Sequence, residues 1–352
     1  MNKDYFSIRL REARLKMGFS MEKLAELTNN AITKQSISRY EKGIMHPKHD
    51  ALRALAQALH ISEEYFKGNN LKIDMPMLRT TSNHRLNDEQ LESIEVKLSF
   101  WAEQYLAKER EADYHTHFEN PIQGTVVRTM EDAIQAADLL RKRWHCGDGP
   151  LPYILRLFER KGIKILITEL PDGILGLSTW ADRQHPLIVL DIRSEKTTTE
   201  QIRFTAAHEL AHLLLSLPEV ELPEEKRCHK FASFFLFPRQ TFIEEMGEEH
   251  REELTLGEMI DLRELYGVSI AAQVHEAWDL GMISRQHYDW WYDERIKKNK
   301  KETGWGSYPY PETIGREKRL NSIINHIENK EEDRLALPTT EDDGGDTAKG
   351  PG

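Results

Sequence analysis

The segment His208-Glu209-Leu210-Ala211-His212 combines the residue types from which proteins build catalytic zinc sites. In a helix, positions i and i+4 lie one turn apart on one face, so both imidazoles can reach one Zn²⁺ at about 2.0–2.1 Å. Glu209 would then project beside the metal, where it can take a proton from water. Such a string also arises by chance, but its apolar flanks and the strand expected before it favour a metal site over two packed histidines.

Two histidines leave a catalytic zinc one ligand short, because such an ion takes three protein ligands and keeps a fourth position for water. The next expected helix offers three candidates on one face, Glu225, Cys228 and His229, at positions i, i+3 and i+4. A carboxylate, a thiolate and an imidazole can each bind zinc. The residues themselves leave the third ligand open.

Three motifs surround these candidates in order. Arg203 to His212 match R-F-T-x-A-H-E-x-x-H, Glu225 to Ala232 match E-x-x-A/C-N/H-x-F-A, and Leu236 to Pro238 match L-x-P. Together they resemble the signature of the ImmA/IrrE family of zinc metallo-endopeptidases, over about residues 139–281.

That resemblance implies a Zn²⁺ cofactor held by His208, His212 and Glu225, with Glu209 as the catalytic base. His229 stands where the family often has Asn, so it is an alternative ligand, a residue that supports the ligands, or a substrate contact. Cys228 occupies a small-residue position, which favours buried packing.

Residues 20–43, SMEKLAELTNNAITKQSISRYEKG, carry a second motif. A helix-turn-helix needs one helix that packs, a small turn, and a second helix that offers polar side chains to the major groove. The small Ala25, the apolar Ile37 and the closing Glu41-Lys42-Gly43 resemble the Cro and phage-repressor (XRE) family, over Ile8 to Leu59. Met21 departs from that family, which often has a phosphate-binding Gln there.

The XRE resemblance implies double-stranded operator DNA as a partner. The side chains expected on the DNA face are Lys34, Gln35, Ser36, Ser38 and Arg39. Lys and Arg can donate to guanine, and Gln can pair with adenine. The alternative is a solvated helix face that contacts nothing.

Apolar spacing and turn residues divide the chain into five parts. We expect a multidomain protein that begins with an all-α helix-turn-helix domain (1–68) and a linker with a connecting helix (69–128). An α+β zincin-like metallopeptidase domain (129–281), an extension (282–327) and a disordered acidic tail (328–352) follow. The helices expected after residue 69 span 88–111, 130–144, 153–160, 199–217, 225–236, 256–266 and 270–280, and the strands 163–170 and 187–192.

The net charge of −11 conceals an asymmetry, because residues 1–68 hold 12 Lys or Arg against 8 Asp or Glu. A positive end on an acidic chain suits phosphate binding. Two cysteines cannot form a disulfide framework, and no apolar run approaches the roughly 20 residues of a membrane span. We therefore expect a cytoplasmic protein with no membrane partner.

These features predict a DNA-binding transcriptional regulator whose zinc domain cleaves a helix-turn-helix repressor and so relieves repression, in a mobile-element, stress or toxin–antitoxin context. The chain itself could also be cut, within Asn69 to Asn87. The alternatives are a repressor whose zinc domain is a non-catalytic sensor or dimerisation module, and an antitoxin. Helix-turn-helix precedent favours a homodimer.

Overall fold

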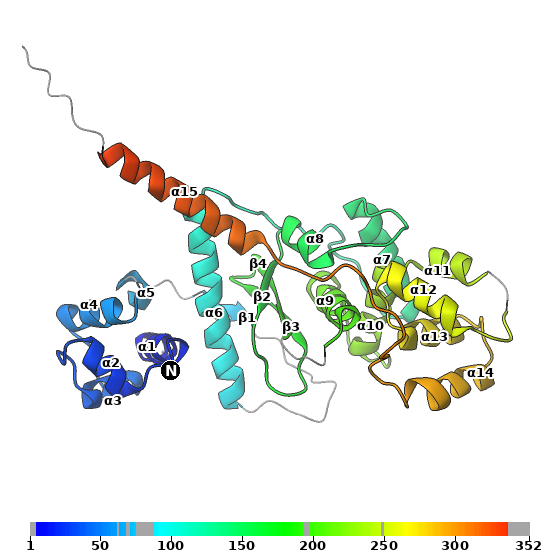
Figure 1. Ribbon diagram of the computed structural model, residues 1–352, viewed down its shortest axis with the longest axis horizontal. Helices are drawn as coiled ribbons and strands as arrows, with labels where there is room; N and C mark the ends of the chain where they lie inside the picture. Colours follow the sequence, from blue (N-terminus) through cyan, green and yellow to red (C-terminus); the bar gives the residue numbers. More distant parts are fainter. Residues whose placement is uncertain are drawn as a thin grey trace, which may run out of the picture.

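Helices dominate the chain, and a small sheet lies near its centre (Figure 1). The computed structural model describes residues 5–61, 63–67, 71–74, 88–192, 197–247 and 250–336. None of the helices among these residues is long and apolar enough to cross a membrane.

The N-terminal domain is entirely helical, as the sequence predicts. Its helices are α1 (Tyr5–Lys16), α2 (Met21–Leu27), α3 (Lys34–Glu41), α4 (His49–Ala58) and α5 (Glu63–Lys67). Ser20 and Thr33 cap α2 and α3, each by accepting a hydrogen bond from the backbone three residues ahead. The turn between them presents α3 at the surface, with only its apolar face, Ile37 and Tyr40, buried.

A buried ion pair ties the exposed helix α3 to α1. Arg14 Nε lies 2.6 Å from Glu41 Oε1, and Arg14 Nη2 lies 2.8 Å from Glu41 Oε2. Gly43 follows at a φ of +66°, which ends the helix in a conformation that glycine adopts without strain. The Glu-x-Gly motif therefore acts on the orientation of α3.

The sheet has four strands in the order β1-β3-β4-β2. They are β1 (Ile73–Asp74), β2 (Lys164–Ile167), β3 (Gly176–Ala181) and β4 (His185–Leu190). Strand β3 pairs antiparallel with β1 and β4, whereas β2 runs parallel to β4. Strands β2 and β4 were predicted, and β1 and β3 were not.

The segment expected to be a linker, 69–87, is in part structured. Ile73 and Asp74 pair with Ala181 and Trp180, so the prediction of a linker is wrong at these two residues. Two residues are too short to produce a periodic signal, and the strand exists only because Ile73 is buried beneath the connecting helix. Residues 68–70 and 75–87 lie outside the described part of the chain.

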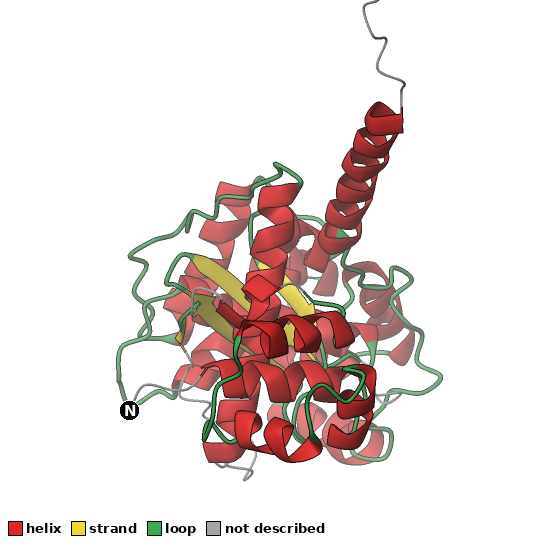
Figure 2. Ribbon diagram, turned by 90° about the vertical axis from the view of Figure 1, so that its left-hand side faces the viewer, coloured by secondary structure: helices red, strands yellow, loops and turns green. Residues whose placement is uncertain are grey.

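The sheet is covered on both faces (Figure 2). Helix α6 (Asp88–Glu111) covers one face, where Leu98 and Ala102 share a buried core with Leu187 and Val189 of β4. Ile188 and Leu190 belong to the other core, with helix α9 (Thr199–Leu214). Because successive strand residues point to opposite faces, β4 must be apolar at every one of these positions.

The remaining helices complete the second layer and the C-terminal extension. They are α7 (Met130–Trp144), α8 (Ile154–Arg160), α10 (Glu224–Leu236), α11 (Arg239–Met246), α12 (Leu256–Tyr266), α13 (Ile270–Asp279), α14 (Arg285–Trp290), the π-helix η1 (Trp291–Ile296) and α15 (Arg316–Ala336). Helix α10 packs between α7 and α9.

Helix α15 returns to α6 and crosses it before projecting outward (Figure 1). Leu320 is fully buried against Tyr105 and Ala112, and Lys108 pairs with Glu317 at 2.7 Å. The helix continues to Ala336, nine residues into the segment 328–352 that was predicted to be a disordered tail. The rest of that segment, 337–352, lies outside the described residues.

Candidate functional site

Helix α9 carries the His208 motif in its second half, with His212 in the last turn. Thr198 caps the helix and exchanges hydrogen bonds with Gln201 in a capping box. His208 and Glu209 are buried, and the side chain of His212 is about one-fifth exposed, at 21%. The motif thus opens to solvent toward its C-terminal histidine.

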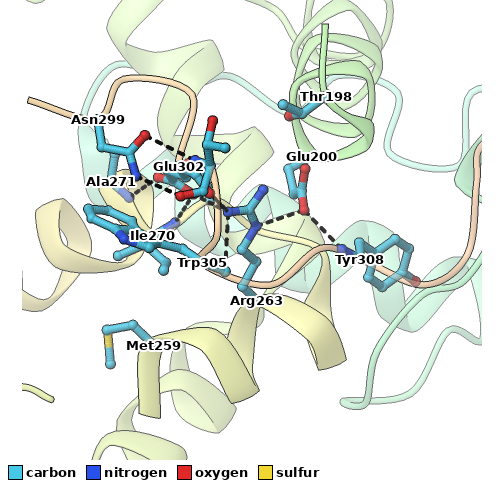
Figure 3. Close-up of polar contacts among 12 residues, drawn as sticks. Thr198, Glu200, Met259, Arg263, Ile270, Ala271, Asn299, Glu302, Trp305 and Tyr308 are labelled. Atoms are coloured by element: carbon cyan, nitrogen blue, oxygen red, sulfur yellow. Dashed lines mark hydrogen bonds and ion pairs between the residues drawn. The ribbon is translucent and has the colours of Figure 1, made fainter. Parts of the chain in front are cut away.

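The first turns of α9 are held by residues of α12 and of the C-terminal extension. Glu200 accepts a hydrogen bond from Arg263 at 2.8 Å and another from the backbone of Tyr308 at 3.0 Å. Figure 3 shows Arg263 lying between Glu200 and Glu302. Glu302 also caps α13 through the N–H groups of Ile270 and Ala271. Because these groups are buried, the network fixes α9 before the motif begins.

Three polar side chains converge beside α9 and α10. The Nε2 atoms of His208 and His212 are 3.2 Å apart, and they lie 3.1 and 3.6 Å from the carboxylate oxygens of Glu225. In a tetrahedral zinc site with bonds of about 2.0–2.1 Å, neighbouring ligand atoms are about 3.3 Å apart. The three donors therefore fit a zinc ion in type, number and spacing.

The buried ring of His208 turns its Nε2 atom toward the other two donors. Its Nδ1 is buried and has no hydrogen-bond partner among the described residues. Its Nε2 side, in contrast, faces His212 and Glu225. Burial opposes the charge of Glu225, but the hydrogen bond with His208 and the charges of the neighbouring histidines together outweigh burial and lower the pKa of Glu225. The carboxylate is thus ready to act as a ligand.

Glu224, which sequence analysis missed, fixes the second imidazole. His212 Nδ1 lies 3.0 Å from Glu224 Oε1, and this contact lowers the pKa of the Glu224 carboxyl. A carboxylate can only accept, so Nδ1 carries the hydrogen, and in the neutral ring Nε2 keeps the lone pair that a metal ligand needs. Burial disfavours charge on His212, but hydrogen bonds with Cys228 and Glu224, together with the charges of Cys228 and Glu209, outweigh burial and raise the pKa of His212. The contact between Glu224 and the His212 ring is seen only in the folded structure, because the two residues lie on different helices.

Cys228 and His229 occupy different places around the cluster. Cys228 is fully buried behind His212, with Sγ 3.7 Å from Nδ1, as packing predicts. His229 is exposed, and its ring stacks on Phe204 and lies 4.6 Å from the ring of His208, between centroids. The group of converging donors includes Glu225 and not His229.

A serine from β3 contacts Glu209. Ser178 Oγ donates to Glu209 Oε2 at 2.7 Å, and both side chains are buried. Sequence analysis missed this residue because it did not predict β3. Gly176 to Ala181 do not alternate apolar and polar residues, so the sequence gives no clear signal of this strand.

The residues predicted to contact DNA lie on α3. Lys34, Gln35 and Arg39 are exposed, whereas Ser36 and Ser38 are half-buried. Lys34 forms an ion pair with Glu22 of α2, and the Ser36 hydroxyl lies 3.0 Å from that of Thr33 at the cap. Gln35 and Arg39 therefore extend from the surface, whereas the exposed Lys34 is paired with Glu22.

Comparison with known families identifies two domains. Residues 10–66 match the helix-turn-helix family, and residues 158–277 match a peptidase family described as the IrrE N-terminal-like domain. The comparison with curated proteins gave no match, and neither did the comparison with solved structures. The XRE and ImmA/IrrE resemblances are thus confirmed. They establish DNA-binding regulation and a metallopeptidase-like domain, of a kind that is typically zinc-dependent.

Proposed function

Since the chain joins a helix-turn-helix domain to an IrrE N-terminal-like domain, we propose that it is a DNA-binding transcriptional regulator with zinc-dependent endopeptidase activity. Its substrate is a regulatory protein, a helix-turn-helix repressor, whose cleavage relieves repression. The observation that carries this proposal is the convergence of His208 Nε2, His212 Nε2 and the Glu225 carboxylate at tetrahedral spacing.

His208, His212 and Glu225 hold the metal in this proposal. Two imidazoles and one carboxylate form a catalytic rather than a structural donor set, since structural zinc sites are closed by four protein ligands. Bound zinc supplies Lewis-acid activation, which lowers the pKa of water to about 7. His229, the alternative ligand, is not needed to complete three protein ligands.

Glu209 is the general base. It follows the first ligand directly, and its buried carboxylate can take the proton of the attacking water as the peptide carbonyl is attacked. The same carboxylate then delivers the proton to the leaving amine. A non-catalytic sensor or dimerisation domain has no use for a base at this position, so Glu209 favours the peptidase over that alternative.

Helix α3 reads the operator. Lys34, Gln35 and Arg39 contact base edges in the major groove, and Ser36 and Ser38 lie beside them. A homodimer would place two copies of α3 about one helical turn of DNA apart. Sedimentation of the protein with operator DNA measures this stoichiometry, and one protomer per operator would refute the dimer.

Metal analysis and a cleavage assay test the proposal together. Purified protein should hold about one zinc ion that the His208→Ala, His212→Ala double variant lacks. The zinc-loaded protein should cut helix-turn-helix repressors encoded near its gene, and Glu209→Gln should bind zinc and DNA without cutting. A wild-type protein that takes up no supplied zinc would refute the site. Regulation that survives Glu209→Gln would instead support the non-catalytic repressor or an antitoxin.

A further inference from the structure

Strand β3 brings a hydroxyl to the proposed base from outside its own helix. Gly176, Ser178 and Trp180 alternate with Leu177, Thr179 and Ala181 along β3, so these two sets point to opposite faces of the sheet. Leu177 and Ala181 belong to the core under α6. Ser178 therefore points toward α9, where its Oγ reaches Glu209 Oε2.

Gly176 allows β3 to lie close enough to α9 for the hydrogen bond between Ser178 and Glu209. A Cβ at Gly176 would lie 2.5 Å from Cγ2 of Thr205 and 3.3 Å from Cγ of Glu209. The first distance is shorter than any real contact of this kind, so a side chain there would force the Thr205 side chain, or β3 and α9 themselves, to move. The absence of a side chain at this position lets the strand come within hydrogen-bonding distance of Glu209 two residues later, at 2.7 Å.

The hydrogen bond distinguishes the two oxygens of the carboxylate. Oε2 accepts from Ser178, whereas Oε1 accepts no hydrogen bond from any residue that the structure describes. A serine hydroxyl has one hydrogen to donate, and this bond to a charged acceptor is of the strong kind. It restrains the rotation of the buried carboxylate and leaves Oε1 to receive the proton.

We propose that Ser178 is a positioning residue that holds Glu209 in the orientation needed for proton transfer, an inference that rests on the peptidase function proposed above. Ser178 acts through Glu209 and touches neither the metal ligands nor the substrate. Its effect should therefore fall on turnover, with little effect on zinc binding or on substrate binding.

Substitution of Ser178 tests this role in the zinc-loaded full-length protein. Ser178→Ala should lower kcat for repressor cleavage by about tenfold to hundredfold, the effect of losing one hydrogen bond to a charged group. KM and zinc stoichiometry should not change. Ser178→Thr keeps the hydroxyl and should recover most of the loss. Thr179→Ala is the matched control, because that hydroxyl points to the other face and donates to the backbone of Asp74.

A second readout keeps the inference separate from the identity of the substrate. Acetohydroxamate binds zinc and offers a hydrogen to a neighbouring carboxylate, so its affinity, measured by calorimetry, reports the orientation of Glu209. Ser178→Ala should weaken its binding severalfold, and Thr179→Ala should not.

Three outcomes would overturn the inference. They are wild-type kcat in Ser178→Ala, unchanged hydroxamate affinity in that variant, and loss of zinc or of folding in both Ser178→Ala and Ser178→Thr, which would make the residue structural. A wild-type protein that binds zinc and hydroxamate but cuts no repressor would refute the proposed function alone, and the hydroxamate comparison would still decide the role of Ser178.

Discussion

Arg203 and Glu312 form an ion pair that is completely shielded from solvent, with Nη1 2.6 Å from Oε1 and neither side chain exposed. Arg203 lies on α9 five residues before the first histidine of the motif, and Glu312 lies in the C-terminal extension. The same carboxylate accepts from the N–H groups of Ile154 and Leu155 at the start of α8. The extension, beyond the matched residues 158–277, therefore belongs to the fold that holds the candidate site.

Removal of the Glu312 charge should lower the stability of the folded protein. Glu312→Gln leaves Arg203 without its charged partner in the core, and we expect the free energy of unfolding to fall by about 3–5 kcal/mol. Urea denaturation measures the loss. Asp289→Asn, which breaks the exposed pair with Arg285, is the matched control and should leave the stability unchanged. Equal effects in the two variants would contradict a special role for the buried pair.

The Glu200–Arg263 pair predicts a dependence of stability on pH. Burial raises the pKa of Glu200, but hydrogen bonds from Arg263 and the backbone of Tyr308 outweigh burial and leave its pKa below the ordinary 4.5. A carboxyl whose pKa is lower in the folded state stabilises the protein above the unfolded pKa, and this contribution disappears as the pH falls through the folded pKa.

Glu200→Gln should therefore lower stability most at neutral pH. Its difference from wild type should shrink as the pH falls below about 4.5. Urea unfolding at pH 7 and across the acid range measures this difference. A constant difference at all pH values would show that Glu200 does not titrate as proposed.

Glu224 should tune zinc affinity without being a ligand. Glu224→Gln weakens the acceptor that holds His212 Nδ1–H, so the dissociation constant for zinc should rise about 10- to 100-fold while stoichiometry stays at about one. Competition with a chromophoric chelator measures this change. Glu221→Gln, at an exposed position on the preceding loop, provides the comparison. Complete loss of zinc in Glu224→Gln would make Glu224 a ligand instead.

His229 should be dispensable for metal binding. His229→Asn should keep about one zinc per chain, because Glu225 lies with the two histidines and His229 does not. Glu225→Gln should lose most of the metal under the same conditions. Metal analysis after dialysis distinguishes the two variants, and the reverse result would exchange the roles of these residues.

Arg39 should contribute to operator recognition. Arg39→Ala removes an exposed donor from α3 and should weaken specific binding by about 1–3 kcal/mol. Fluorescence anisotropy at fixed salt measures the affinity for operator and for random DNA. Arg53→Ala, on α4, removes an equal charge from another helix and should change both affinities little. A uniform loss on both DNAs in Arg39→Ala would indicate a phosphate contact and not a base contact.

The sequence by itself determined the features that depend on local geometry. The spacing of His208 and His212 places both on one face of any helix, and the predicted helices 88–111, 130–144 and 256–266 agree with α6, α7 and α12 to the residue. Apolar periodicity and capping residues suffice for such elements because they act within a few positions of the chain.

Tertiary structure alone decided which distant groups meet. Strand β1 is too short to leave a periodic pattern, and Ser178 and Glu209 are 31 residues apart in sequence. Glu225 and His229 are both chemically suited to zinc, and only the packing of α10 on α9 places Glu225 with the histidines. These contacts depend on how elements pack in three dimensions, which the spacing of residues along one element does not encode.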